Sequence, residues 1–274
     1  MINQGKKGMA TKNIGFGIST EELLVVLGYL KAESMPGLDS DHLKDLDEEQ
    51  LEFALGIAER ALYARGFIIP DPQKKPTLAP TVFSVVGACV MAETTIVASC
   101  NRPDQRREDH YYHTSRQMVV MHYAPNAGIH QFVAVTERDN IAQSILSILQ
   151  LGEKSTLNCQ PLRVKASVFG EARKAVQQNR PTDGLRMLTE AGVELDSAQA
   201  MLDTQSKPVA NTTIGSVEHQ NGKESTDSFT VIEGENGLWI VTTPETKPDP
   251  DPEFLIVPAS AEDVIQRVKI LVKI

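Results

Sequence analysis

The sequence lacks the cysteine and histidine patterns that are typical of disulfide frameworks and structural metal sites. Its 274 residues include three cysteines, Cys89, Cys100 and Cys159, which are far apart and form no CxxC pair. An odd number of widely spaced cysteines argues against a disulfide scaffold and against a zinc module. No HxH, HExxH or Asp-rich metal spacing is present. We therefore expect no metal site and no cofactor.

Catalytic motifs are missing as well. The sequence has no GxSxG elbow, no glycine-rich phosphate loop and no dinucleotide fingerprint, and Gly15-Phe16-Gly17 is a lone GxG with no strand before it. Cys100 near Arg102, with His113 as a base, is better explained as an ordinary cysteine at a strand end. The sequence thus identifies no catalytic residue and favours a protein that is not an enzyme. Sites assembled from scattered residues would leave no motif of this kind.

Long apolar runs are also absent. No segment approaches the roughly 18 apolar residues of a membrane span, and residues 1–18 are rich in Gly, Lys and Asn without the apolar centre of a signal peptide. We expect a mobile arm at residues 1–18, a cytoplasmic location and no membrane partner. The net charge of −9 argues against nucleic acid as a partner, because phosphate binding requires a positive surface.

The N-terminal third of the chain has helical patterns. A capping residue, Ser19 or Thr20, ahead of two glutamates predicts a helix that ends at Pro36-Gly37. A second helix is expected from Asp47 to Arg65. Residues 79–91 are apolar and contain no lysine or arginine. Such a segment is typical of a core helix and not of the recognition helix of a DNA-binding module.

Strand patterns follow, and the last one leads into a helix. We expect antiparallel strands at residues 94–99, 111–114, 118–123 and 129–136. The segment from Asn101 to Asp109 contains three arginines and three acidic residues, so we expect it to project into solvent as a loop. Thr136 stands three residues before Asp139, which predicts a capped helix that continues to Leu151.

The remainder of the chain repeats this order. We expect helices at 164–179, 184–191 and 195–205, strands at 212–218, 229–232, 238–243 and 254–257, a polar loop at 220–227 and an exposed tether at 244–253. Trp239 alternates with Val241 and should face the core. Ser260 stands three residues before Asp263 and predicts the start of a terminal helix.

The repeated order predicts an α+β fold with two pseudo-symmetric halves. Each half has helices and a mostly antiparallel sheet followed by a capping helix. The predicted organisation is an arm at 1–18, a first half at 19–152 and a second half at 153–274, with one joint domain as the alternative.

Histidines cluster in the first of these sheets. Alternation places His110 and Tyr112 on one side of a strand and Tyr111 and His113 on the other, with His122 and His130 on the neighbouring strands. Three histidines across a sheet can bind zinc. Because no metal-binding spacing is present, we favour half-exposed sheet histidines without a metal.

Three features of the sequence resemble those of the EspG family, which are the cytosolic chaperones of type VII (ESX) secretion. They are the opening SxEELxxxLxxL helix at Ser19 to Leu30, the ALxxRGF element at Ala61 to Phe67, and the two β units with their final helices, Phe132 to Leu151 and Phe254 to Ile274. The resemblance spans residues 18–274. It implies a protein that binds the helical tip of a secreted PE–PPE pair and keeps it soluble for export.

By position, the resemblance implies partner contacts from the loop arginines Arg102, Arg106 and Arg107 and from the nearby C-terminal helices. The chain departs from the family in its Pro-Asp tether at 244–253 and in its long polar second loop, so the partner's identity is not implied.

Two hypotheses follow for the function. The first is a non-enzymatic chaperone or adaptor that holds a helical secreted partner, and it requires an exposed apolar patch near residues 101–109. The second is a small enzyme with a site at the junction of the two halves, and it requires a pocket where histidines 110, 113, 122 or 130 converge with shifted pKa values. We favour the first, with a helical protein as the partner and no prediction for the oligomeric state.

Overall fold

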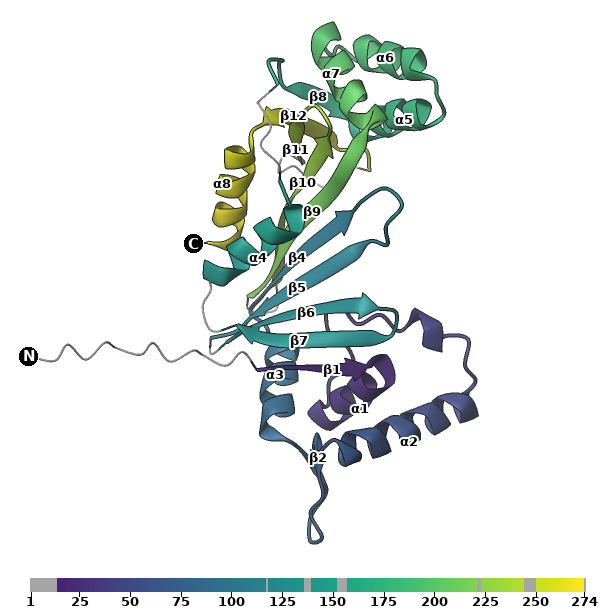
Figure 1. The fold of residues 1–274 in the computed structure, drawn as a ribbon, viewed down its shortest axis with the longest axis vertical. Helices are drawn as coiled ribbons and strands as arrows, with labels where there is room; N and C mark the ends of the chain where they lie inside the picture. The colour runs from purple at the N-terminus through teal and green to yellow at the C-terminus, as the bar shows by residue number, and fades with distance from the viewer. Residues whose placement is uncertain are drawn as a thin grey trace, which may run out of the picture. The chain divides into compact units, whose positions relative to one another are not determined.

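The computed structural model describes residues 14–116, 118–135, 139–151, 157–220, 223–243 and 250–273, and the chain divides into two compact units. Unit 1 comprises residues 1–93 and 111–138, and unit 2 comprises residues 94–110 and 139–274. Both combine helices with antiparallel strands (Figure 1). The predicted α+β fold class is confirmed.

The strands of unit 1 run in the order β1-β7-β6-β5. Their bounds are Gly15–Ser19 for β1, Ile129–Val135 for β7, Val119–Asn126 for β6 and Glu108–Thr114 for β5, of which residues 111–114 belong to this unit. The expectation that residues 15–18 belong to a mobile arm was wrong, because they pair antiparallel with β7 from Gly15 opposite Val133 to Ser19 opposite Ile129. Residues 1–13 lie outside the described residues.

The helices of unit 1 begin where side chains cap them. The elements are α1 (Thr20–Leu30), η1 (Asp41–Leu43), α2 (Glu48–Ala64), β2 (Ile68–Ile69), β3 (Thr77–Leu78) and α3 (Pro80–Val90). The predicted starts of α1 and α2 are confirmed, since Ser19 with Glu22 and Asp47 with Gln50 form capping boxes. Helix α1 ends earlier than expected, at Leu30, because Lys31 takes the left-handed conformation that closes a helix.

The core of unit 1 lies between its helices and one face of its strands. Helices α1 and α3 contact β7, α3 also contacts β6, and α2 packs on α1 (Figure 1). The interpretation of residues 79–91 as a core helix is confirmed, because Val82, Val85, Val86 and Cys89 of α3 are buried. They join residues of α1, α2, β6 and β7, including Phe132, in one cluster.

The strands of unit 2 run in the order β4-β9-β10-β11-β12-β8. Their bounds are Thr94–Asn101, Pro208–Gln220, Lys223–Gly234, Leu238–Thr242, Glu253–Ala259 and Leu162–Lys165. The polar loop expected at 220–227 was wrong for residues 223–227, which pair with residues 216–220 as part of a long hairpin. Residues 164–165 end a strand and do not begin a helix. Residues 244–249 of the expected tether lie outside the described residues.

Helices cover the strands of unit 2 from both faces (Figure 1). They are α4 (Asp139–Leu149), α5 (Ala166–Gln177), α6 (Pro181–Glu190), α7 (Leu195–Ser206) and α8 (Ala261–Val272). The predicted Ser260 cap of α8 is confirmed, whereas Thr136, the predicted cap of α4, lies outside the described residues. Trp239 is fully buried as expected, and its Nε1–H donates to Thr204 Oγ1 of α7 at 3.0 Å.

Candidate partner-binding groove

One face of the unit 2 sheet is only partly covered. Phe229 of β10 faces α8, where the Arg267 guanidinium lies 5.7 Å from the centre of its ring. Alternate residues of a strand point to opposite faces, so Ser228, Thr230 and Ile232 face the other way. Ile232 packs under the α5–α7 cluster. Beyond it the sheet is open, and this open part is the floor of a groove.

The groove has a volume of about 660 Å³ and a floor of small side chains. Strand register places Val97, Gly215 and Ser228 in one row across β4, β9 and β10. The next rows are Ser99, Thr213 and Thr230, and then Asn101 and Asn211. None of these residues is large, so a partner can approach close to the backbone of the sheet.

Helix α5 forms one wall of the groove. It contributes Ala166, Phe169, Gly170 and Arg173, and Phe254 of β12 also lines the cavity. A Cβ atom added to Gly170 would have no atom within 4 Å, which means that the helix surface is bare at this point. Phe169 is buried in the α5–α7 core, and it fixes the helix beside the groove.

The floor is polar and offers hydrogen-bonding groups. The hydroxyls of Thr213 and Thr230 lie 2.9 Å apart and share a hydrogen bond. The side-chain oxygen of Asn211 is buried and has no hydrogen-bond partner among the described residues. Leaving a buried polar atom in this state costs free energy.

The structure separates the three arginines that were predicted as contacts. The guanidinium of Arg102 is 15% exposed, donates to the carbonyl oxygen of Ile148 in α4 and lies 3.8 Å from Glu108. Arg106 is exposed on the loop. Arg107 lines the groove and pairs with Asp109 at 2.9 Å. The loop itself is shorter than expected, residues 102–107, because Asn101 and Glu108 belong to strands.

The surface beside this loop is not the apolar patch that a chaperone was expected to need. Serine, threonine and asparagine form most of the floor, and the large apolar side chains that line the groove, such as Phe169 and Ile232, are mostly buried.

The histidine cluster lies in unit 1 and is buried. His113, His122 and His130 are at most 1% exposed, which corrects the expectation of half-exposed side chains. The predicted alternation is confirmed, because Tyr111 and His113 stack on the same side, with ring centres 6.2 Å apart. The ring of His122 stacks between its neighbours, 5.8 Å from His113 and 5.2 Å from His130.

Hydrogen bonds connect this cluster to the start of α1. His122 Nε2 lies 2.9 Å from His130 Nδ1, and His130 Nε2 lies 3.0 Å from Thr20 Oγ1, whose hydroxyl donates to the carbonyl of Asp39. Burial lowers the pKa of His113 to about 4. Burial and the neighbouring histidines hold the pKa of His122 well below its usual value.

The histidines of this cluster are separate from the residues that line the groove. No histidine is among the residues found to line the groove, and His110, whose pKa is also lowered by burial, belongs to unit 2. Within the described ranges, no three His, Cys, Asp or Glu side chains are grouped so as to hold a metal ion. The imidazoles of His122 and His130 are hydrogen-bonded to each other in the interior of unit 1.

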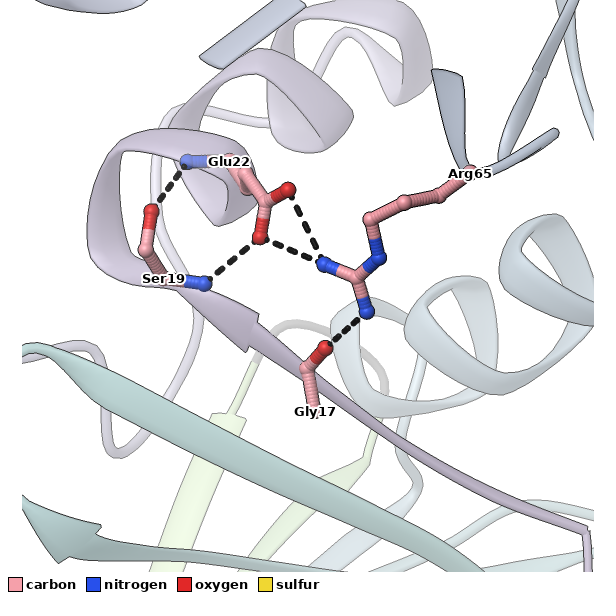
Figure 2. Close-up of polar contacts among 4 residues, drawn as sticks. All are labelled: Gly17, Ser19, Glu22 and Arg65. Atoms are coloured by element: carbon pink, nitrogen blue, oxygen red, sulfur yellow. Dashed lines mark hydrogen bonds and ion pairs between the residues drawn. The ribbon is translucent and has the colours of Figure 1, made fainter. Parts of the chain in front are cut away.

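Two motifs of the N-terminal region meet in unit 1 (Figure 2). Nη1 of Arg65, from the ALxxRGF element, lies 3.0 and 2.9 Å from the two carboxylate oxygens of Glu22, from the SxEEL helix start. Its Nη2 donates to the carbonyl of Gly17 in β1, and its guanidinium lies 4.4 Å from the centre of the Phe67 ring. The motifs thus join β1, α1 and the end of α2, and their role is structural.

Comparison with known proteins places the chain in a family. The model of the family described as "Uncharacterised protein YfjC" matches residues 19–267. The chain belongs to the YfjC family. No curated protein sequence matches it.

Among solved structures, this YfjC-family chain is similar to the Mycobacterium tuberculosis type VII secretion system chaperone EspG5 in complex with the PE25–PPE41 dimer. The TM-score is 0.65, the sequence identity is 12%, and the match covers 95% of each chain. At this identity the likeness shows the fold. The chain therefore has an EspG-like fold, as the sequence resemblance implied.

Sequence reasoning missed most of the groove. It identified Arg107, but it did not single out Arg173 or the floor residues. A signal was present in the alternation of Asn211, Thr213 and Gly215 along β9, where small or polar residues occupy every second position. Alternation of this kind marks a strand face that is not packed against a helix.

None of the helices that the structure describes is long and apolar enough to cross a membrane.

Proposed function

We propose that the chain is a non-enzymatic chaperone or adaptor that binds the end of a helical protein in the groove of unit 2. The observation that carries the proposal is the uncovered sheet between Arg107 and α5, with its floor of small polar side chains. The EspG-like fold supports it, because the similar solved structure is of a chaperone bound to a protein dimer.

The chemistry of the groove defines the partner. Gly170 and Gly215 leave room for a helix to approach both the wall and the floor. The last carbonyl groups of a helix carry partial negative charge and lack hydrogen-bond donors. Arg107, Arg173 and the hydroxyls of the floor supply donors to such a helix end or to acidic side chains beside it. The partner is therefore a helix or helical hairpin with a polar, acidic tip.

We extend the proposal to a secreted partner. EspG5 is a type VII secretion chaperone solved with the PE25–PPE41 dimer. By analogy, this chain holds a helical protein in the cytoplasm before export. The loop arginines 102, 106 and 107 remain part of the proposed contact surface, with Arg107 in the groove and Arg102 as the support that ties the loop to α4.

The test is capture of a partner from the source cell by the full-length chain and by two variants of one residue. Gly170→Trp fills the groove from a position where the native chain has no neighbouring atom, so we expect it to fold and to lose the partner. Gly170→Ala is the matched control and should retain it. With the captured protein purified, titration calorimetry should show a loss of affinity of at least about thirtyfold for the tryptophan variant.

Two results decide the proposal. Retention of the same partner by Gly170→Trp, with unchanged affinity, places binding elsewhere and overturns the groove assignment. Capture of no protein by the wild-type chain argues against a chaperone altogether. An Arg106→Ala variant tests the exposed part of the loop, because Arg106 does not line the groove, and loss of the partner in that variant alone assigns binding to the loop.

A further inference from the structure

The outer face of α2 carries apolar side chains that the fold does not use. Phe53 is 67% exposed and Ile57 is 46% exposed, and they stand four residues apart on one side of the helix. The inner side of the same helix is packed through Ala58 and Leu62, of which Leu62 is fully buried. Helix α2 thus has one apolar face for the core of unit 1 and a second that faces water.

Gly56 lies between these side chains on the outer side of α2. A Cβ atom at this position would meet no atom within 4 Å. Glycine in the middle of a helix is destabilising relative to alanine, and no close contact of this position demands it here. A bare position next to two exposed apolar side chains allows another helix to approach closely.

The outer face of α2 also carries charged residues of opposite sign at its two ends. Glu49 precedes Phe53 by one turn, and Arg60 follows Ile57 by one turn, so the four residues share a face with acid at one end and base at the other. Both charged side chains are exposed. When such a face meets a copy of itself in antiparallel orientation, each acid comes to the level of the opposite base.

We propose that this face of α2 docks a second copy of the chain, with the two helices antiparallel about a twofold axis at the level of residue 55, one residue from Gly56. Phe53 of each copy then lies opposite Ile57 of the other, and Glu49 of each lies within one residue's rise, about 1.5 Å, of the level of Arg60 of the other. The arrangement is self-complementary, which a twofold interface requires. This inference is independent of the groove in unit 2.

The size of the face sets the strength expected. Stable interfaces bury at least about 1,200 Å² in total, and the exposed apolar part of this face consists of only two side chains, Phe53 and Ile57. The dimer is therefore weak, with a dissociation constant in the micromolar range or above. Its ion pairs lie at the rim and weaken as salt screens them.

The experiment is sedimentation velocity of the full-length chain over a range of concentrations from about 5 μM to about 500 μM at low salt. We expect the wild-type chain to shift from monomer to dimer, and Phe53→Ser with Ile57→Ser to remain monomeric. Phe83→Ser is the matched control, because Phe83 is 58% exposed on α3 and should leave the association unchanged.

Charge reversal tests the orientation. Glu49→Arg and Arg60→Glu should each weaken dimerisation at least about tenfold, and the double variant should restore it, because the acid and the base have exchanged places. A wild-type chain that stays monomeric throughout overturns the proposal. An equal loss of dimerisation in Phe83→Ser also overturns the proposal. If the double charge-reversal variant does not recover dimerisation, the antiparallel arrangement is wrong. If Phe53→Ser instead removes a different captured protein from a monomeric chain, that protein is the occupant and the second copy is not.

Discussion

His113, His122 and His130 stack in the interior of unit 1, where each is at most 1% exposed. Burial disfavours the charged imidazolium, and it therefore lowers the pKa of His113 to about 4 and of His122 well below the usual value. Both side chains are neutral at pH 7. Their protonation would bring a charge into a core formed by aromatic rings, so the folded state resists it.

This burial predicts an acid-sensitive fold. Between the unfolded pKa of about 6.5 and the folded pKa of about 4, the unfolded chain binds a proton at His113 that the folded chain does not, so stability falls as the pH falls through this window. The full effect of His113 is about 3 kcal/mol. We expect the urea midpoint to drop between pH 7 and pH 4.5. His113→Phe keeps a ring in the stack and should flatten this dependence, and an unchanged slope in that variant would contradict the assignment.

Among the elements, the end of β10 packs directly on α7. A Cβ atom at Gly234 would lie 2.8 Å from the backbone oxygen of Thr204 and 3.0 Å from its Cα, closer than such atoms approach. The same threonine accepts the hydrogen bond from buried Trp239. The irregular pairing at Gly234 thus fixes α7, and with it the α5–α7 group that forms the wall of the groove.

A single methyl group should disturb this contact. We expect Gly234→Ala to lower the free energy of unfolding by about 1–3 kcal/mol, because the backbone of α7 has to move. Gly170→Ala adds the same methyl in the open groove and should be neutral or stabilising by about 0.5–1 kcal/mol. Urea unfolding of both variants measures the difference. Equal stabilities would show that α7 is not held at Gly234.

The contact between Arg65 and Glu22 links β1, α1 and α2 through charge. The Glu22 side chain is only 9% exposed, and its carboxylate accepts from the Ser19 backbone as well as from Arg65, which is 40% exposed (Figure 2). A nearly buried carboxylate depends on its partners, because water does not reach it. Loss of one partner should therefore cost more stability here than at an ion pair of similar length on the surface.

Removal of the arginine tests this difference. We expect Arg65→Met to destabilise the chain by about 1–2 kcal/mol, since Glu22 is left buried without its partner. Arg116 pairs with Glu93 at 2.8 Å while 88% exposed, and Arg116→Met should change stability by less than about 0.5 kcal/mol. Thermal or urea unfolding of both variants makes the comparison, and equal losses would mean that burial of Glu22 has no effect.

At the scale of the whole molecule, the charge of the groove is opposite in sign to the net charge of the chain. The chain has a net charge of −9, yet the charged side chains that line the groove are Arg107 and Arg173. Asp109 offsets part of the charge of Arg107, but the side chains that line the groove are still positive, and a local positive site on an acidic protein attracts acidic partners and slows the approach of basic ones. The internal repeat and the division at residue 152 stay predictions at this scale.

The charge of the groove should appear in the kinetics of partner binding. We expect the association rate of the captured partner to fall roughly tenfold between 0.05 and 0.5 M NaCl, because salt screens the two arginines. Arg107→Gln with Arg173→Gln should bind slowly at low salt and depend little on salt. Stopped-flow or surface binding measurements test this expectation. A wild-type association rate that does not change with salt concentration would show that electrostatic attraction does not contribute to recognition.

Local signals in the sequence predicted many of the elements but fewer of their limits. Ser19, Asp47 and Ser260 were identified as caps because a cap needs only its own residue and the one three positions later. The strand at residues 15–19 was missed because its partner, β7, is more than a hundred residues away. Residues 223–227 were interpreted as a loop because they are polar, although they pair with residues 216–220 in a hairpin.

The sequence by itself determined the caps, the alternation of Trp239 with Val241, the apolar face of α3 and the resulting α+β class. These depend on neighbours within a few positions, where geometry is set by the period of the element. Only the tertiary structure decided that the histidines are buried, that Arg102 turns to α4 while Arg107 lines the groove, and that Arg65 meets Glu22. Those outcomes depend on which segments pack together over long separations, and that choice is made by the whole core at once.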